Sequence, residues 1–220
     1  MLAIAPVRII LLGAPGAGKG TIAQGLIDAL GLPHLSTGDM LRSAIKEDTS
    51  VGRVAKDYMD RGQLVPDDVM VDLIDERVQK DDCNHGQTAT RYMLDGFPRT
   101  LPQADALDAR GLGPDKVIYI KVPDEVLVER LTGRRSCPGC GAPYHIRFKP
   151  PENEGVCDRC QGQLVHRSDD REGPIMKRLI VFNTQTKPLE NRYENVMLEI
   201  DGSQTPRAVL QDVLEGLQVN

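Results

Sequence analysis

The chain has 220 residues, 40% of them hydrophobic and 27% charged, which is the composition of a globular protein with one core and room for a small appendage. Its formal net charge of −5 argues against a general nucleic-acid or anionic-membrane surface, because such surfaces need clustered basic residues. No apolar run approaches the roughly 18 residues of a membrane-spanning helix. We therefore expect a cytoplasmic protein, and a monomer because no apolar helix face stands out.

Short apolar runs alternate with segments of helical periodicity along the chain. The first run is interpreted as a buried strand rather than a signal peptide, because Arg8 interrupts the apolar N-terminus and no basic region precedes it. Strands are expected at 8–12, 32–35, 92–94, 117–122 and 196–200, and helices at 19–30, 38–46, 51–61, 67–80, 103–109, 125–132, 175–186 and 207–217. The alternation predicts an α/β fold with right-handed crossovers and a mostly parallel sheet covered on both faces.

The stretch 134–170 breaks this alternation, since it is rich in Gly, Pro, Cys and Arg and has little periodicity. A module of this size with so few apolar side chains should not fold unaided, so we expect a cross-link to hold it together. Its candidate core residues are Tyr144, Ile146, Phe148, Val156, Leu164 and Val165.

Two Cys-x-x-Cys pairs lie in this stretch, Cys137 with Cys140 and Cys157 with Cys160, separated by sixteen residues. The spacing is that of a zinc ribbon. Four thiolates complete a tetrahedral shell without an open position, so the predicted Zn²⁺ is structural rather than catalytic. Two disulfides are the alternative, which a reducing cytosol disfavours, and redox catalysis would need only one pair.

Three further residues could bind a metal near this cluster or elsewhere. Cys83 is interpreted as an ordinary small apolar residue rather than a fifth functional thiol. His145 and His166 lie near the cysteine pairs, but a closed four-sulfur shell does not need them.

The stretch GAPGAGKGT, from Gly13 to Thr21, follows the first expected strand and opens the first expected helix. Its glycines allow backbone N–H groups to converge on a polyphosphate at the helix N-terminus, and Lys19 adds a positive charge. The preceding strand, the following helix and the lysine in register argue against a turn without a ligand. The usual phosphate-loop pattern has Ser or Thr directly after the lysine, whereas here Gly20 takes that place and Thr21 comes one residue later.

Three motifs together resemble the nucleoside monophosphate kinases, and the adenylate kinases in particular. GAPGAGKGT has the Gly-Lys-Gly-Thr variant of that family's phosphate loop, and STGDMLR (36–42) and DGFPRTLPQA (95–104) resemble its monophosphate-binding segments. The four-cysteine insert followed by HRSDD (166–170) resembles the zinc-bearing lid of the long bacterial form. The resemblance spans residues 8 to about 208, with the motifs in the family's order.

The resemblance implies a P-loop three-layer sandwich with a five-stranded parallel sheet, a helical monophosphate-binding segment and a small zinc-ribbon-like lid. It divides the chain into a core domain (1–35, 67–133 and 171–220), a monophosphate-binding segment (36–66) and a zinc-binding lid (134–170). The implied reaction is reversible phosphoryl transfer from Mg²⁺-bound ATP to AMP, giving two ADP. Such a transfer needs in-line positioning, neutralised charge and exclusion of water, which calls for several arginines.

On the donor side, the resemblance implies that the phosphate loop wraps the phosphates of ATP while Lys19 follows the phosphoryl group. Thr21 is implied as the hydroxyl near Mg²⁺, and Asp95 as the carboxylate that holds Mg²⁺ through water, with a plain helix cap as the alternative for Asp95. The implied ATP-binding residues are Gly16, Ala17, Gly18, Lys19, Gly20, Thr21, Arg134, Pro143, Tyr144 and Gln204.

On the acceptor side, Arg42 and Arg99 are implied to bind the α-phosphate of AMP, since a guanidinium group can bind phosphate oxygens at two places. The Gln103 amide is implied to pair with the adenine edge. The implied AMP-binding residues are Thr37, Arg42, Gln63, Leu64, Val65, Gly96, Phe97, Pro98, Arg99, Gln103, Arg167 and Arg178.

The implied catalytic residues surround the transferring phosphoryl group. Any one of these arginines alone would be interpreted as a solvated surface charge, but three matching motifs place them as a set. Asp169 and Asp170 are interpreted as a latch of the lid or a cap of the next helix rather than as catalytic groups. The implied catalytic residues are Lys19, Arg99, Arg130, Arg134, Arg167 and Arg178.

Three stretches depart from the family's pattern. Gly173-Pro174 stands where the family has Thr-Val after a Glu, and a proline there is compatible with the first turn of a helix. The stretch 81–96 is longer than usual, and the extra residues (within 83–92) are interpreted as a surface loop without catalytic consequence. Gln204 takes the place of a lysine near the adenine, at a position that acts through its backbone.

Two other functions remain open. A UMP/CMP kinase would share the phosphate loop and the arginines, but it commonly has Ala in place of Thr37 and lacks the zinc lid. A zinc-ribbon protein that binds nucleic acid would need a basic ribbon and stacking aromatics, whereas the chain has only three Phe and five Tyr and is acidic.

Overall fold

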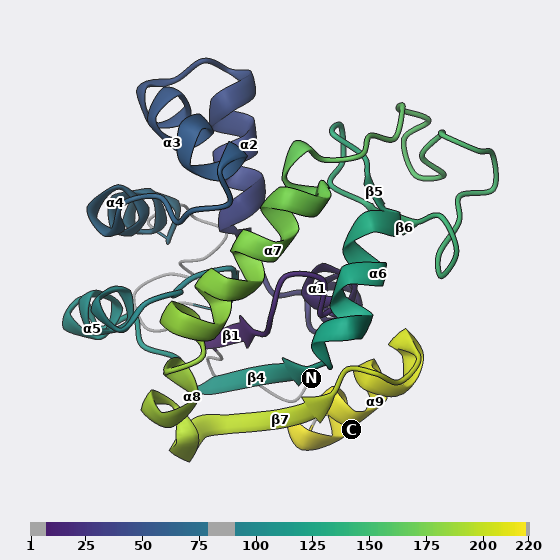
Figure 1. Ribbon diagram of the computed structural model, residues 1–220. Coiled ribbons are helices and arrows are strands. Elements are labelled where there is room, and N and C mark those ends of the chain that lie inside the picture. The colour runs from purple at the N-terminus through teal and green to yellow at the C-terminus, as the bar shows by residue number, and fades with distance from the viewer. Residues whose placement is uncertain (1–7, 79–90, 219–220) are drawn as a thin grey trace.

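The computed structural model describes residues 8–78 and 91–218. Its centre is a five-stranded sheet in the order β2 (His34–Ser36), β3 (Tyr92–Asp95), β1 (Arg8–Leu12), β4 (Lys116–Lys121) and β7 (Met197–Asp201). Figure 1 labels β1, β4 and β7 of this sheet. Every neighbouring pair is parallel. The central strands are buried on both faces, which explains why they appear as continuous apolar runs in the sequence. The predicted α/β fold with a five-stranded parallel sheet is confirmed.

Helices cover both faces of this sheet. The helices of the described residues are α1 (Lys19–Leu30), α2 (Thr37–Lys46), α3 (Ser50–Asp60), α4 (Asp67–Val78), α5 (Leu101–Ala109), α6 (Asp124–Gly133), α7 (Glu172–Val181), α8 (Leu189–Arg192) and α9 (Pro206–Gly216). Of these, α3 packs mainly on α2 rather than on the sheet. Along the sheet, the connection from β1 to β2 runs in one direction, whereas those from β3 to β4 and from β4 to β7 run in the other. Because crossovers are right-handed, α1 lies on one face of the sheet and α5 to α8 lie on the other. Contacts of α1 with α9, of α5 with α8 and of α6 with α7 agree with these three layers.

Two element boundaries differ from the predicted ones for physical reasons. Strand β2 begins two residues late, because Pro33 has no N–H to donate to a neighbouring strand. Helix α7 begins at Glu172 with Pro174 inside its first turn, and it runs into a π-helical turn over Phe182–Thr186. The end of the predicted helix 67–80, Cys83 and most of the stretch 81–96 lie outside the described residues.

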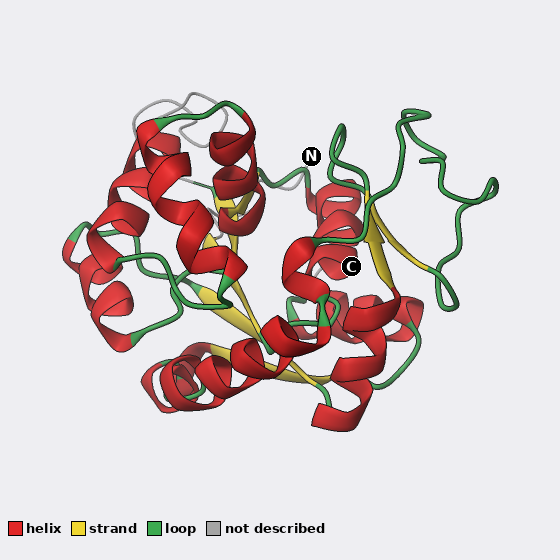
Figure 2. Cartoon of the chain, turned by 45° about the horizontal axis from the view of Figure 1, so that its top comes forward, coloured by secondary structure: helices red, strands yellow, loops and turns green. Residues whose placement is uncertain are grey.

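The cysteine-rich stretch forms a small antiparallel pair, β5 (Arg134–Ser136) and β6 (Pro143–His145), which leads into irregular loops (Figures 1 and 2). Both three-residue strands were missed by the sequence pattern, since three residues carry no periodicity. The buried cluster of this stretch consists of Cys137, Ala142, Tyr144, Cys157 and Leu164.

Of the six candidate core residues of this stretch, only Tyr144 and Leu164 belong to its buried cluster, Val156 is half-buried, and the other three were predicted wrongly. Ile146, Phe148 and Val165 are 59%, 52% and 41% exposed. The cysteines take the centre instead, so little apolar area is left to bury. None of the helices in the described ranges is both long and apolar enough to cross a membrane.

Candidate active site

The loop between β1 and α1 has a backbone geometry that favours glycine. Gly13, Gly16 and Gly18 have φ angles of 149°, 87° and 100°. A Cβ on Gly13 would lie 2.7 Å from the carbonyl oxygen of Ile120 in β4, so this position also needs glycine for space. Gly18 directly precedes α1, which begins at Lys19, so the loop ends at a helix N-terminus, where backbone N–H groups bind anions.

The Lys19 ammonium lies over this loop. Its Nζ donates to the carbonyl oxygens of Gly13 (2.7 Å) and Ala14 (3.1 Å). Burial lowers the pKa of Lys19 to about 8, and the positive charges of nearby arginines add to the effect. A bound phosphate would oppose both causes, because an opposite charge favours the ionised form. The site is therefore arranged for an anion.

Arg99 is held at three of its atoms. Its backbone N–H donates to Oε1 of Gln103 (2.7 Å), its Nε donates to the carbonyl of Gly96 (2.7 Å), and its own carbonyl accepts from Oγ1 of Thr186 (2.8 Å). Burial lowers the pKa of Arg99 to about 10, with repulsion from Arg178 as the next cause, so the group is still cationic at neutral pH. These contacts pre-orient its terminal nitrogens for an anionic ligand.

Helix α2 contributes a second arginine to the site. Thr37, fully buried at its start, donates from Oγ1 to main-chain carbonyls at the end of β3 (3.2 and 3.0 Å). Arg42 forms an ion pair with Asp39 one turn earlier, and Nη2 of Arg167 lies 3.7 Å from the same carboxylate. The α2 segment and the lid end therefore meet at one carboxylate.

A buried carboxylate joins two further arginines. Asp170 is 0% exposed, and its oxygens accept from Nε (2.7 Å) and Nη2 (2.5 Å) of Arg134 and from Nη1 of Arg178 (2.9 Å). Arg178 also pairs with Asp169 at 3.0 Å. Burial opposes ionisation of Asp169, but the surrounding arginines outweigh it and hold its pKa below the usual value. These aspartates therefore anchor cations, which is more than the predicted latch or cap.

Arg130 makes different contacts from the other predicted catalytic arginines. Its Nη2 donates to the carbonyl of Gly202 (2.9 Å) and its Nη1 to the carbonyl of Ala17 (3.4 Å). The guanidinium group thus joins the phosphate loop to the loop that follows β7. Its side chain still lines the cavity described next.

These groups surround one cavity of about 970 Å³. The charged groups interact across the cavity: burial, together with repulsion from Arg134 and Arg42, lowers the pKa of Arg167 to about 10. Phe97 is the exception among the predicted ligands, since it is 1% exposed and packs in the core instead. The predicted site residues that line the cavity are Gly16, Ala17, Gly18, Lys19, Gly20, Thr21, Thr37, Arg42, Gln63, Leu64, Val65, Asp95, Gly96, Pro98, Arg99, Gln103, Arg130, Arg134, Pro143, Tyr144, Arg167, Arg178 and Gln204.

Asp95 and Thr21 offer oxygen ligands at the edge of the phosphate loop. Burial opposes ionisation of Asp95, but the nearby His34 and the charge of Lys19 outweigh it, so its pKa is below the usual value. His34 Nε2 lies 3.5 Å from Oδ2 of Asp95. Both residues line the cavity, and an ionised carboxylate and a hydroxyl suit Mg²⁺, which prefers oxygen ligands and keeps several waters.

The two glutamines predicted near the bases are both engaged with acidic residues. Nε2 of Gln103 donates to Oδ1 of Asp67 (2.7 Å). Nε2 of Gln204 donates to Oδ2 of Asp212 (2.8 Å). The side chain of Gln204 therefore has a partner within the protein.

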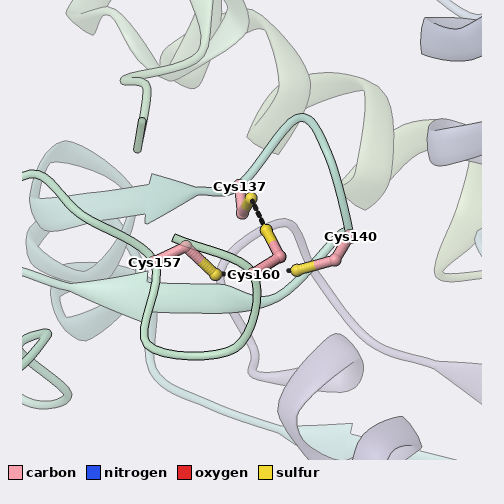
Figure 3. Close-up of side chains that lie close together, drawn as sticks. All are labelled: Cys137, Cys140, Cys157 and Cys160. Atoms are coloured by element: carbon pink, nitrogen blue, oxygen red, sulfur yellow. Dashed lines mark hydrogen bonds between the residues drawn. The ribbon is translucent and has the colours of Figure 1, made fainter. Parts of the chain in front are cut away.

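The four cysteines of the stretch 134–170 converge, as Figure 3 shows. All their Sγ atoms lie within 4.8 Å of one another, with 3.3 Å between those of Cys137 and Cys160 and 3.6 Å between those of Cys140 and Cys157. A tetrahedral Zn²⁺ with ligands at ~2.3 Å needs sulfurs about 3.8 Å apart, whereas a disulfide needs ~2.05 Å. The cluster therefore fits zinc, and among the described residues no histidine joins it.

Comparisons with known proteins agree with this geometry. The adenylate kinase family model matches residues 11–198. The chain belongs to the adenylate kinase family. It is 46% identical over 218 residues to an adenylate kinase of Caldicellulosiruptor saccharolyticus, a match that covers 96% of this chain and 99% of the relative.

Two further adenylate kinases are similar over nearly the full length. That of Geobacter sp. (strain M21) is 49% identical, covering 96% of this chain and 99% of the relative. That of Clostridium perfringens is 47% identical, covering 94% and 96%. Membership of the adenylate kinase family confirms the resemblance seen in the sequence and does not favour the UMP/CMP kinase or the nucleic-acid-binding alternative.

Sequence reasoning missed several residues that hold the adenylate kinase site together. Asp39 precedes Arg42 by three residues, a spacing that favours ion pairs on a helix and could have been noticed. Asp67 and Thr186 gave no local signal, because their partners Gln103 and Arg99 lie 36 and 87 residues away.

Proposed function

We propose that this adenylate kinase transfers the γ-phosphoryl group of Mg²⁺-bound ATP directly to AMP, giving two ADP, in the arginine-lined cavity. The reaction class follows from membership of the family, and the division of labour among the residues is the proposal. The observation that carries it is the convergence of Lys19 and the six predicted arginines on one cavity, which Arg159 also lines. Two anionic nucleotides repel each other unless cations outweigh that repulsion.

The donor half of the site is assigned to the phosphate loop and the lid. Backbone N–H groups from Gly16 to Thr21 bind the phosphates of ATP at the start of α1. Lys19 moves from its carbonyl contacts to the transferring phosphoryl group and regains full charge there. Arg130 holds the loop after β7, the base side of the donor site, against the phosphate loop.

The acceptor half is assigned to α2 and the segment after β3. Arg42 and Arg99 bind the phosphate of AMP, with Arg99 already oriented by its three fixed atoms. Gln103 meets the base, and Thr37 ties α2 to the end of β3. Arg134, Arg167 and Arg178 would then stabilise the charge on the phosphoryl group between the two nucleotides.

Asp95 and Thr21 would hold Mg²⁺, Asp95 through water, and the ion would neutralise charge on the phosphates of ATP. The chain's own contribution there is an ionised carboxylate that lies 3.5 Å from His34. The four cysteines would hold Zn²⁺ in the lid, where it replaces an apolar core. We assign 134–170 as a lid that closes over ATP, because water in the site would cause hydrolysis.

A coupled assay with ATP and four acceptors tests this function. We expect ADP formation with AMP at a kcat/KM well above that with CMP, UMP or GMP. Arg99→Ala should lower turnover with AMP on the order of 10³-fold, the typical effect of removing an arginine from a phosphoryl-transfer site. Arg53→Ala is the matched control, because Arg53 is exposed and pairs only with exposed Asp48. Equal use of all four acceptors, or equal losses in both variants, would contradict the proposal.

A further inference from the structure

We infer that Asp67, together with the backbone N–H of Arg99, determines which class of base the acceptor site takes, by fixing the orientation of the Gln103 amide. The inference rests on the proposed function, in which Gln103 meets the base of the acceptor nucleotide. Asp67 is the first residue of α4 and comes from outside the motifs that place the other acceptor residues. It acts through Gln103, so it is a positioning residue.

Asp67 and Gln103 belong to a compact network. Nε2 of Gln103 donates to Oδ1 of Asp67 (2.7 Å), and Oε1 of Gln103 accepts from the backbone N–H of Arg99 (2.7 Å). The hydroxyl of Thr100, the N-cap of α5, donates to Oδ2 of Asp67 (3.2 Å) and accepts from the N–H of Gln103 (3.2 Å). Gln103 is only 2% exposed, yet it lines the cavity.

The two partners of the amide permit one orientation only. A backbone N–H can only donate and a carboxylate can only accept. Reversing the Gln103 amide would set its NH₂ group against the N–H of Arg99 and its oxygen against Asp67. Both contacts would become repulsive in a buried site, where unpaired polar groups are costly.

The fixed amide has one further lone pair on Oε1 and one further proton on Nε2 for a ligand. This pair complements a base that has an exocyclic amino donor beside a ring-nitrogen acceptor, as adenine and cytosine have. Hypoxanthine, guanine and uracil present the opposite order, an oxo acceptor beside an N–H donor, and would need the reversed amide. When Arg42 and Arg99 hold the phosphate of a nucleotide, its base cannot shift far enough to exchange the positions of its donor and its acceptor.

The test compares AMP with inosine monophosphate, in which an oxo group replaces the 6-amino group. Asp67→Asn, whose amide can donate as well as accept, should lower the preference for AMP, as the ratio of kcat/KM values, at least tenfold. The change should appear mainly in the KM for AMP. Asp68→Asn is the matched control, since Asp68 is the exposed neighbour in the same first turn of α4. It should leave the preference unchanged.

The outcomes separate the inference from the proposed function. If Gln103→Ala abolishes the preference for AMP but Asp67→Asn keeps it, the Asp67 inference is wrong and the function stands. If Gln103→Ala leaves both the KM for AMP and the preference unchanged, the base contact itself is wrong. Should Asp67→Asn not fold, NMR of the unaltered protein decides: we expect the Gln103 Nε2 proton that faces Asp67 to exchange slowly with solvent. Fast exchange would overturn the inference.

Discussion

Replacing Asp170 by Asn tests how the arginines are held together. The substitution keeps the shape of the side chain but removes the negative charge that joins Arg134 and Arg178. Breaking a buried ion pair by removing one partner typically costs about 3–5 kcal/mol, out of about 5–15 kcal/mol for the unfolding of a whole domain. For a chain of this size the loss corresponds to a fall in Tm of roughly 6–20 °C.

The assay for Asp170→Asn is thermal unfolding of the variant with and without nucleotides. Because the two arginines then lack their buried counter-charge, phosphates should restore more stability in the variant than in the unaltered protein. Asp48→Asn is the control: its ion pair with Arg53 is exposed, and its positive φ of 50° suits Asn, so Tm should change little. If Asp170→Asn melts like the unaltered protein, Asp170 does not hold the arginines and this reasoning is refuted.

Three further predictions concern the phosphate loop and the lid. The pKa of Lys19 is lowered to about 8, so the lysine loses its charge as pH rises through 8. The kcat/KM for ATP should therefore fall near that pH, whereas kcat, which reports the nucleotide-bound state, should fall only at higher pH. Coincident pH profiles of the two parameters would contradict this. The hydroxyl of Tyr144 lies 3.5 Å from Sγ of Cys157 and would donate to it once zinc binds the thiolate. Tyr144→Phe should therefore weaken zinc binding about 10–100-fold in competition with a chromogenic chelator, and an unchanged affinity would argue against this. Gln161 has a φ of 59° at the position where the other cysteine knuckle has Gly141. Gln161→Gly should relieve this strain and raise the free energy of local unfolding of the lid, measured by hydrogen exchange, by about 1 kcal/mol. Lower protection of the lid amides would show that no strain is relieved.

The phosphate loop and the cysteine cluster were predictable because their constraints are local. The φ angles of Gly13 and Gly18 depend on a few consecutive residues, and the Cys-x-x-Cys spacing by itself brings two sulfurs to one ion. The parallel sheet was predictable too, since strands buried on both faces form apolar runs.

The remaining features depend on contacts between distant parts of the chain. The π-helical turn that brings Thr186 to Arg99 has no sequence signature, because the Thr186 hydroxyl donates to the carbonyl of Arg99, which lies 87 residues away in the sequence. In the lid, hydrophobicity wrongly predicted Ile146 and Phe148 as core, since a cluster of thiols occupies the centre and leaves these side chains exposed. The hydrogen bond between Asp67 and Gln103 could not be predicted for the same reason, since the two residues are 36 positions apart in the sequence.

The account depends on direct transfer between two nucleotides held in one cavity, and the stereochemistry at phosphorus tests it most directly. The substrate is ATP whose γ-phosphorus is chiral through oxygen isotopes, with AMP as acceptor, and the configuration of the transferred group in ADP is determined. A single in-line displacement predicts inversion. Retention would mean two successive displacements through a phosphorylated side chain, and it would contradict the account.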